Sequence, residues 1–387
     1  MSHMSQQAGV AGVAGVAGVA GVAGVAGVAG VAGVAGVAGV AGVAGVAGLP
    51  TYTGASGSLA LPDALIKSRD SLAYSTHAFW TQTTWKPARW QAKTPPIADG
   101  LPAGEQPQRI KHWQRNVVGY LLEFELMHAL SFSAAGGNTA VITASDGQPL
   151  FQATRPAFND FRQQLALVDS YSDLRGDRAS EIVAQVLPQW SFWSSIVDLN
   201  TDRTPRTIEL VGAALQFAML CVMRTKHALA CPRPIEYSGL IQPMIQTPAY
   251  AALPSGHATE AYMFATIMEA LLGLVPGNPG DAQTQLQLYR QAHRIAENRV
   301  VAGLHFPVDS IAGKLLGQTL ARYFIHLCGA ATNFTPSTFT GPGIGVAEPL
   351  ADTGFATDAG TSQGSSRIIA ANALLKEAWK SAQTEWR

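Results

Sequence analysis

Residues 254–274 read PSGHATEAYMFATIMEALLGL, and this stretch decides the fold of the chain. Pro254 and Ser255 stand directly before a long apolar run, which is where a serine side chain caps the first turn of a helix. The run that follows predicts a helix over residues 256–274. The first-turn N–H groups and the positive dipole end of that helix favour an anion at its N-terminus.

Helical patterns continue on both sides of this stretch and leave little room for strands. Pro205 suits the first turn of a helix, where a missing backbone N–H costs nothing. One small β-hairpin is expected from residues 139–143 and 149–152. The expected fold class is therefore all-α, a helical bundle with at most this hairpin. Helices are predicted over residues 112–131, 156–170, 175–187, 205–228, 256–274, 282–299, 308–327 and 367–385.

The composition excludes several classes of protein. The 387 residues hold 26 Lys and Arg against 26 Asp and Glu, so no basic surface for nucleic acid is expected. The cysteines, Cys221, Cys231 and Cys328, lack metal-ligand spacing and are predicted to be buried thiols. The longest apolar run, residues 210–223, is shorter than the ~20 residues that cross a bilayer, which predicts a core helix and no membrane span.

A low-complexity run precedes the globular sequence. Residues 8–46 are 13 perfect Ala-Gly-Val triplets, and the first residues resemble a cloning remnant before a native start at Met4. Glycine costs a helix about 1 kcal/mol per site relative to alanine, so residues 1–48 are predicted to be a tail without a specific fold. β-type self-association and membrane contact stay open as alternatives. Residues 49–387 then form one helical domain, expected to be soluble and, if Met4 is the native start, cytoplasmic, with export left open.

Two cations are the first residues that point to a chemistry. Lys226 lies near the end of a long predicted helix, and Arg233 follows between Pro232 and Pro234. The prolines hold this backbone extended, so Arg233 leaves from a stiff loop instead of continuing the helical face. The two cations can therefore approach one anion from different directions.

The stretch quoted above adds neutral donors and an imidazole. The hydroxyl of Ser255, the backbone N–H of Gly256 and the helix dipole form a ready site for an oxyanion. Gly256 also permits a ligand to approach the backbone closely. His257 projects from the same first turn, beside the anion, where its imidazole can move a proton.

A third group repeats this arrangement at a second helix start. Arg299 is predicted to end one helix, and His305 stands just before Pro307, where the next helix can begin. Asp309 can reach back to one imidazole nitrogen of His305, which leaves the other nitrogen free as a nucleophile or ligand. Several cations, a hydroxyl, a backbone amide and two imidazoles together are the donors that a tetrahedral oxyanion such as phosphate or vanadate requires.

The spacing of these groups resembles that of a known superfamily. It is similar to the motifs shared by type 2 phosphatidic acid phosphatases, bacterial acid phosphatases and vanadium-dependent haloperoxidases. The resemblance extends over residues 205–329 and implies the helical bundle of these enzymes. Asn298 departs from the pattern, because the family usually has serine before the arginine of the third motif. The motifs are Lys226-x6-Arg233-Pro234, Pro254-Ser255-Gly256-His257 and Arg299-x5-His305-x3-Asp309.

The resemblance implies a catalytic role for each of these residues. His305 would bond covalently to vanadium or phosphorus, Asp309 would hydrogen-bond to it, and His257 would be the general acid and base. The remaining donors would bind the oxygens of vanadate, the implied cofactor, or of phosphate in the same site. These oxyanion ligands are Lys226, Arg233, Ser255, Gly256 and Arg299.

Two activities share this set of residues. In the phosphatases His305 would carry the phosphoryl group, whereas in the haloperoxidases a resident vanadate binds hydrogen peroxide and oxidises a halide. Tyr250 lies seven residues before His257, where haloperoxidases place an aromatic residue or a histidine beside the halide. Tyr250 and the size of the globular part favour a haloperoxidase, with an acid phosphatase as the alternative. The expected partners are accordingly small molecules, either hydrogen peroxide and a halide or a phosphoester.

A protein of another class is the remaining alternative. The chain could act in assembly or at a surface through its repeat, with a vestigial anion site, and a homo-oligomer stays open. The complete set of anion-binding residues argues against a vestigial site.

Overall fold

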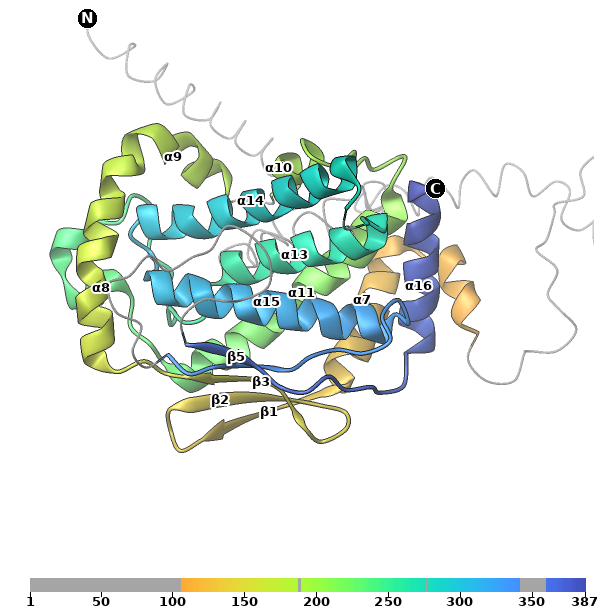
Figure 1. The fold of residues 1–387 in the computed structure, drawn as a ribbon, viewed down its shortest axis with the longest axis horizontal. Coiled ribbons are helices and arrows are strands. Elements are labelled where there is room, and N and C mark those ends of the chain that lie inside the picture. Colours follow the sequence, from red (N-terminus) through yellow and green to blue (C-terminus); the bar gives the residue numbers. More distant parts are fainter. Residues whose placement is uncertain (1–105, 187–188, 276, 342–359) are drawn as a thin grey trace, which may run out of the picture. The chain divides into compact units, whose positions relative to one another are not determined.

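A computed structural model describes residues 106–186, 189–275, 277–341 and 360–387. The predicted tail and its boundary at residue 48 lie outside the described residues, so those two expectations stay predictions. Within the described part, long helices lie over a small sheet (Figure 1).

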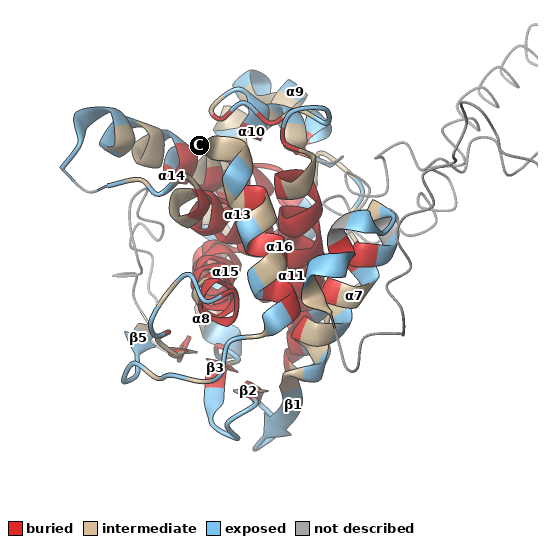
Figure 2. Cartoon of the chain, turned by 90° about the vertical axis from the view of Figure 1, so that its right-hand side faces the viewer, coloured by how far each residue is buried: buried red, intermediate tan, exposed pale blue. Residues whose placement is uncertain are grey.

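Four long helices form the core. α13 (Gly256–Leu272) packs against α11 (Pro205–Leu229), α14 (Pro279–Val301) and α15 (Pro307–Leu327), and the four lie together in Figure 1. α11, α13 and α15 are buried over most of their length and are therefore largely red in Figure 2. The helix expected over residues 256–274 thus lies at the centre of the fold, because it presents buried residues on all sides.

Two glycines of α15 let it lie close against α13. A Cβ atom at Gly313 would come within 2.6 Å of the carbonyl oxygen of Ser255, and one at Gly317 within 2.2 Å of that of Thr259. Neither distance is compatible with a real side chain, so both positions require glycine for the close approach of two backbones. This contact fixes the N-terminal part of α13 on α15.

Replacing Gly317 with alanine is expected to destabilise the fold by about 1–3 kcal/mol, as is typical of overpacking in a core. The added Cβ meets backbone atoms of α13, which cannot rotate away as a side chain can. Gly119 on α7 (Arg115–His128) is the matched control, because nothing lies within 4 Å of its Cβ position and a helix favours alanine there by about 1 kcal/mol. Chemical denaturation measures both changes, and an unchanged stability of Gly317→Ala would contradict the close packing.

Shorter helices surround the core. α7 and α16 (Ala373–Gln383) pack on α11, whereas α8 (Phe158–Tyr171) and α9 (Arg175–Ala184) pack on α14. Every helix predicted from the sequence is present, but the last, predicted over residues 367–385, begins only at Ala373. The remaining helical turns are η4 (Pro107–His112), η5 (Ser172–Leu174), α10 (Trp190–Ser194), α12 (Pro234–Tyr237), η6 (Gly239–Ile241) and η7 (Thr384–Trp386).

The mainly helical fold is confirmed, but a five-stranded sheet is also present, so the limit of one small hairpin is wrong. The strands pair in the order β1-β2-β3-β4-β5. The expected hairpin is confirmed as β2 and β3, which are antiparallel, but β1 pairs with β2, β4 pairs with β3 in parallel, and β5 pairs with β4. The strands are β1 (Leu130–Ala135), β2 (Thr139–Ala144), β3 (Pro149–Thr154), β4 (Ser337–Phe339) and β5 (Thr361–Gln363).

The missed strands were too short, or too dependent on distant pairing, to be predicted from local sequence. β4 and β5 have 3 residues each, which is too few to display the alternation of a strand. Their pairing is also distant in sequence, since Phe151 of β3 pairs with Ser337 of β4. β1 takes its first two residues from the helix predicted over 112–131, because α7 ends at His128.

α11 combines length, apolar composition and burial. Within the described residues, one helical stretch, Pro205–Tyr237, is long and apolar enough to cross a membrane, with a mean hydropathy of 1.5. The fold buries 78% of its most apolar window, as it would for the core helix of a packed domain. The hydropathy is therefore weak support for a membrane span.

The three cysteines are free and buried, as predicted.

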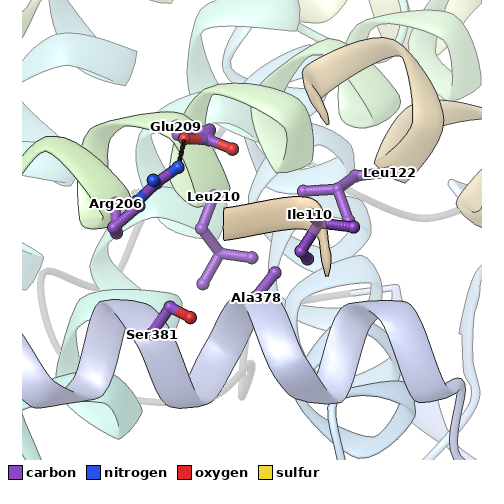
Figure 3. A pocket seen from close by; sticks show the side chains of 7 residues that line it. All are labelled: Ile110, Leu122, Arg206, Glu209, Leu210, Ala378 and Ser381. Atoms are coloured by element: carbon purple, nitrogen blue, oxygen red, sulfur yellow. Dashed lines mark hydrogen bonds and ion pairs between the residues drawn. The ribbon is translucent and has the colours of Figure 1, made fainter. Parts of the chain in front are cut away.

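A small cavity of about 10 Å³ lies where α7, α11 and α16 meet (Figure 3). Arg206 Nη1 and Glu209 Oε2 form an ion pair of 2.9 Å in its wall. The cavity holds one water molecule at most. It is therefore too small for a substrate.

Candidate active site

The structure brings the three sequence motifs together. Lys226 lies in the last turn of α11, Arg233 is the N-cap of α12, and Arg299 lies in the last turn of α14. The second and third motifs form the N-terminal ends of α13 and α15. All of the predicted ligands and catalytic residues are buried, namely Lys226, Arg233, Ser255, Gly256, His257, Arg299, His305 and Asp309.

His305 is held by Asp309 and faces Arg233. Its Nδ1 lies 3.0 Å from Asp309 Oδ2, an oxygen that also accepts from the backbone N–H of Phe306 at 2.9 Å. A carboxylate can only accept, so Nδ1 carries the proton and Nε2 keeps its lone pair. Arg233 Nη1 donates to this Nε2 at 2.9 Å. The nitrogen that can attack or ligate therefore points towards a cation.

Backbone carbonyls of one loop hold two of the cations. Lys226 Nζ donates to the carbonyls of Ala251 and Ala252 at 2.8 and 2.6 Å. Arg233 Nε donates to the carbonyl of Tyr250 at 2.9 Å. Neutral carbonyls fix these side chains without supplying opposite charge. Burial lowers the pKa of Lys226 well below its ordinary value, so an anion bound beside it would favour its charged form.

Tyr250 packs against two of the cations and lines an open cavity. The centre of its ring is 5.5 Å from Lys226 Nζ and 5.2 Å from Arg233 Cζ, which places both cations over the aromatic face. Tyr250 and Arg233 also line a cavity of about 490 Å³ that opens at the surface. This cavity offers an approach to Arg233 from outside.

Ser255 joins α13 to α15. Its side-chain oxygen accepts from the backbone N–H of Ala258 at 3.4 Å, so it caps α13 as predicted. Its backbone N–H donates to the carbonyl of Asp309 at 2.8 Å. Two helix N-termini, with their positive dipole ends, therefore lie next to each other.

Arg299 is the most buried of the cations, with 0% of its surface exposed. Its Nη2 donates to Gln185 Oε1 at 3.0 Å and to the carbonyl of Ile182 at 3.2 Å. Among the described residues, its Nε and Nη1 have no hydrogen-bond partner. A buried donor without a partner costs about 1–3 kcal/mol, and more if it is charged. These two N–H groups therefore fit the oxygens of a bound anion.

α9 contributes residues that the sequence motifs did not include. The backbone carbonyl of Gln185 accepts from His257 Nε2 at 3.0 Å, and its side chain accepts from Asn298 Nδ2 at 3.0 Å. Asn298 also donates to Glu181 and accepts from Arg178. The sequence held one signal of these contacts, namely Asn298, which stands where the superfamily usually has serine. An amide can donate and accept hydrogen bonds through separate atoms, so it can join α14 to several residues of α9.

Burial disfavours the charged form of most groups in the site. It lowers the pKa of His257 to about 3, with the positive charge of Arg299 as the next cause, and lowers the pKa of His305 well below its ordinary value. Burial also lowers the pKa of Arg299 to about 10 and raises that of Asp309 to about 7. A bound oxyanion would shift the pKa of both histidines upwards, because it adds opposite charge beside them.

The donor set fits an oxyanion rather than a bare metal ion. In the part of the chain that the structure describes, no group of three or more His, Cys, Asp and Glu residues is arranged to hold a metal. The free N–H groups of Arg299, the charges of Lys226 and Arg233, and the lone pair of His305 suit a tetrahedral anion. Vanadate and phosphate share that shape, so the same residues fit either.

Comparison with known families corrects the prediction for the partners. Residues 5–62 match the collagen triple helix repeat. Collagen chains associate in threes and carry glycine at every third position, because only glycine fits at the crowded axis. The Ala-Gly-Val run has this spacing. The match therefore supports self-association of the chain. This corrects the expected partners, which were small-molecule substrates with a homo-oligomer left open.

A second match covers the site. Residues 209–332 match the PAP2 superfamily, and all three motifs fall within this range. A vanadium-dependent bromoperoxidase of Ascophyllum nodosum is 31% identical over an alignment of 113 residues, and the alignment covers 24% of this chain and 20% of that protein. The similarity thus spans about a fifth of the length of this relative. The chain therefore contains a PAP2 superfamily domain over residues 209–332 and is similar in part to a vanadium-dependent bromoperoxidase.

Proposed function

We propose that this chain is a vanadate-dependent haloperoxidase that oxidises a halide with hydrogen peroxide. The main support is the buried guanidinium of Arg299, whose unpartnered N–H groups share a site with two further cations and the lone pair of His305. The similarity to a vanadium-dependent bromoperoxidase favours this reaction over phosphoester hydrolysis.

Vanadate would be bound through His305 Nε2, with its oxygens held by the other donors. When bound, it supplies a Lewis-acid centre that activates hydrogen peroxide towards the halide. Asp309 keeps the proton of His305 on Nδ1, so that Nε2 stays available as a ligand. The oxygen-binding donors would be Lys226, Arg233, Ser255, Gly256 and Arg299.

His257 would move the protons of the reaction. It lies in the first turn of α13, beside the cations. Because burial lowers its pKa to about 3, the ring is neutral near pH 7 and can accept a proton from hydrogen peroxide. The positive ring can then return the proton to a leaving oxygen.

The enclosure of the site agrees with small reactants. Lys226 and Arg233 are each 2% exposed, and His305 is 4% exposed. Hydrogen peroxide and a halide ion are small enough to enter such a site, whereas a phosphoester must bring an organic leaving group next to His257. The open cavity at Tyr250 is suited to the organic acceptor of the oxidised halide.

Phosphoester hydrolysis is the second candidate, and the match to the PAP2 superfamily favours it. His305 Nε2 would attack phosphorus, with its tautomer set by Asp309, and His257 would protonate the leaving oxygen. The cations would bind the oxygens of the phosphoryl group as they would bind those of vanadate.

A paired assay of one preparation separates the two activities. Halogenation of monochlorodimedone with hydrogen peroxide and bromide or iodide is measured with and without added vanadate, beside hydrolysis of p-nitrophenyl phosphate. We expect halogenation that depends on vanadate. Phosphoester hydrolysis that vanadate merely inhibits, without halogenation, would reverse the assignment.

Replacing Tyr250 with alanine is expected to raise the KM for halide about tenfold, equivalent to about 1.4 kcal/mol. The ring covers Lys226 and Arg233 and lines the open cavity, where an incoming halide would meet it. Steady-state kinetics with varied halide and varied hydrogen peroxide measures the effect. Tyr250→Phe keeps the ring and should behave like the parent. If Tyr250→Ala changed the KM for halide and the KM for hydrogen peroxide equally, Tyr250 would not be part of the halide site.

A further inference from the structure

Gln185 carries a buried hydrogen-bond donor without a partner. Its side chain is 0% exposed, and among the described residues its Nε2 has no hydrogen-bond partner. The orientation of the amide is determined, because Oε1 accepts from Arg299 Nη2 and from Asn298 Nδ2, both at 3.0 Å. Turning the amide over would set its N–H groups against those two donors. The free side of the amide is therefore the donor side.

This free donor belongs to a cluster of free donors. Nε and Nη1 of Arg299, the residue bonded to Gln185, are also buried without a partner among the described residues. The backbone carbonyl of Gln185 accepts from His257 Nε2 at 3.0 Å. One residue thus contacts both the most buried cation and the imidazole that would move protons. An oxyanion is the chemistry that satisfies all of the free donors together.

Gln185 is also held firmly in place. Arg294 donates to both carboxylate oxygens of Glu181 on α9, at 2.9 and 2.6 Å. Asn298 Nδ2 donates to Glu181 at 3.0 Å, and Asn298 Oδ1 accepts from Arg178 at 3.2 Å. These bonds fix α9 on α14. The amide at the end of α9 is therefore positioned before an anion binds, as an anion ligand should be.

We propose that Gln185 is a further oxyanion-binding residue, whose Nε2 donates to an oxygen of the anion held by Arg299 and His305. This inference rests on the proposed function only in requiring an oxyanion at this site, and it holds for vanadate and phosphate alike. Gln185 lies outside residues 209–332, so the part of the chain that matches the PAP2 superfamily does not contain the whole set of ligands.

Two replacements of Gln185 distinguish donation from mere positioning. Gln185→Glu keeps an acceptor for Arg299 and Asn298 but places an anionic oxygen where the donor was, whereas Gln185→Met removes donor and acceptor without adding charge. We expect the Kd for inorganic phosphate and for orthovanadate to rise about tenfold in Gln185→Met and about hundredfold or more in Gln185→Glu. If Gln185 only positioned Arg299, the Kd would rise more in Gln185→Met than in Gln185→Glu, because glutamate would hold the guanidinium at least as well as glutamine does.

Isothermal titration calorimetry of the full chain measures these constants, and thermal unfolding checks that each variant is folded. Gln216→Glu is the matched control, a half-buried glutamine on α11 that lies roughly 15 Å along the helix from Lys226. Its phosphate affinity should stay at the parent value, since its carboxylate is remote from the site.

A measurement on the parent protein does not depend on the folding of any variant. The side-chain amide hydrogens of Gln185, followed by NMR, should exchange more slowly with solvent once phosphate is added. Unchanged exchange, unchanged or tighter binding by Gln185→Glu, or a parent protein that binds neither anion would each overturn the proposal. Absence of halogenation with intact anion binding would overturn only the proposed reaction.

Discussion

Replacing His305 with alanine is expected to abolish halogenation and phosphoester hydrolysis alike, with a loss of about 10³-fold or more in kcat/KM. The Nε2 of His305 is the atom that would bond to vanadium or phosphorus, and Asp309 and Arg233 both hold the ring for that purpose. The Asp309 carboxylate keeps the proton of His305 on Nδ1, so the lone pair lies on Nε2, which faces Arg233. Steady-state kinetics of both reactions measures the loss.

His227→Ala is the matched control for that experiment. His227 is exposed on α11, next to Lys226 in sequence but facing away from the site. Its replacement should leave both reactions at the parent rate. If His305→Ala retained either activity, the assignment of the bonding nitrogen to His305 would be wrong.

Exchanging Arg299 for lysine is expected to weaken the binding of vanadate and of phosphate about hundredfold, equivalent to about 2.7 kcal/mol. Lysine keeps the charge but has no planar fork of N–H groups. It could not bond to Gln185 and Ile182 while also directing two further donors at an anion, as the guanidinium can. Calorimetric titration with either anion measures the change in Kd.

Arg290→Lys provides the comparison for this substitution. Arg290 lies on the same helix, α14, but is exposed at the surface. The Arg290→Lys variant should therefore bind vanadate and phosphate with the same Kd as the parent protein. Equal affinities for Arg299→Lys and the parent would mean that the site needs only a positive charge at this position, which contradicts a role for the oriented N–H groups.

The helices and the donor motifs could be predicted because they depend on neighbouring residues. Ser255 caps α13, and Pro307 occupies the first turn of α15, as expected from the preferences of helix ends. The sheet was missed for the opposite reason. The pairing of Phe151 with Ser337 depends on a packed core and leaves no local pattern in three-residue strands.

The repeat shows another limit of sequence interpretation. Its period of three residues fits neither an α-helix nor a β-strand. The collagen triple helix has a period of three residues per turn, but a single chain cannot form it. The match of residues 5–62 to the collagen repeat therefore points to self-association, which the local sequence of one chain does not reveal.

The sequence by itself determined which residue types meet at the anion site, because the spacing of three motifs places cations, helix N-termini and imidazoles in a known order. Only the tertiary structure decided which of their hydrogen bonds are made and which donors stay free. Gln185 lies 114 positions from Arg299, and its amide meets that guanidinium because α9 packs on α14. Such a contact depends on how the helices pack, which local sequence does not encode.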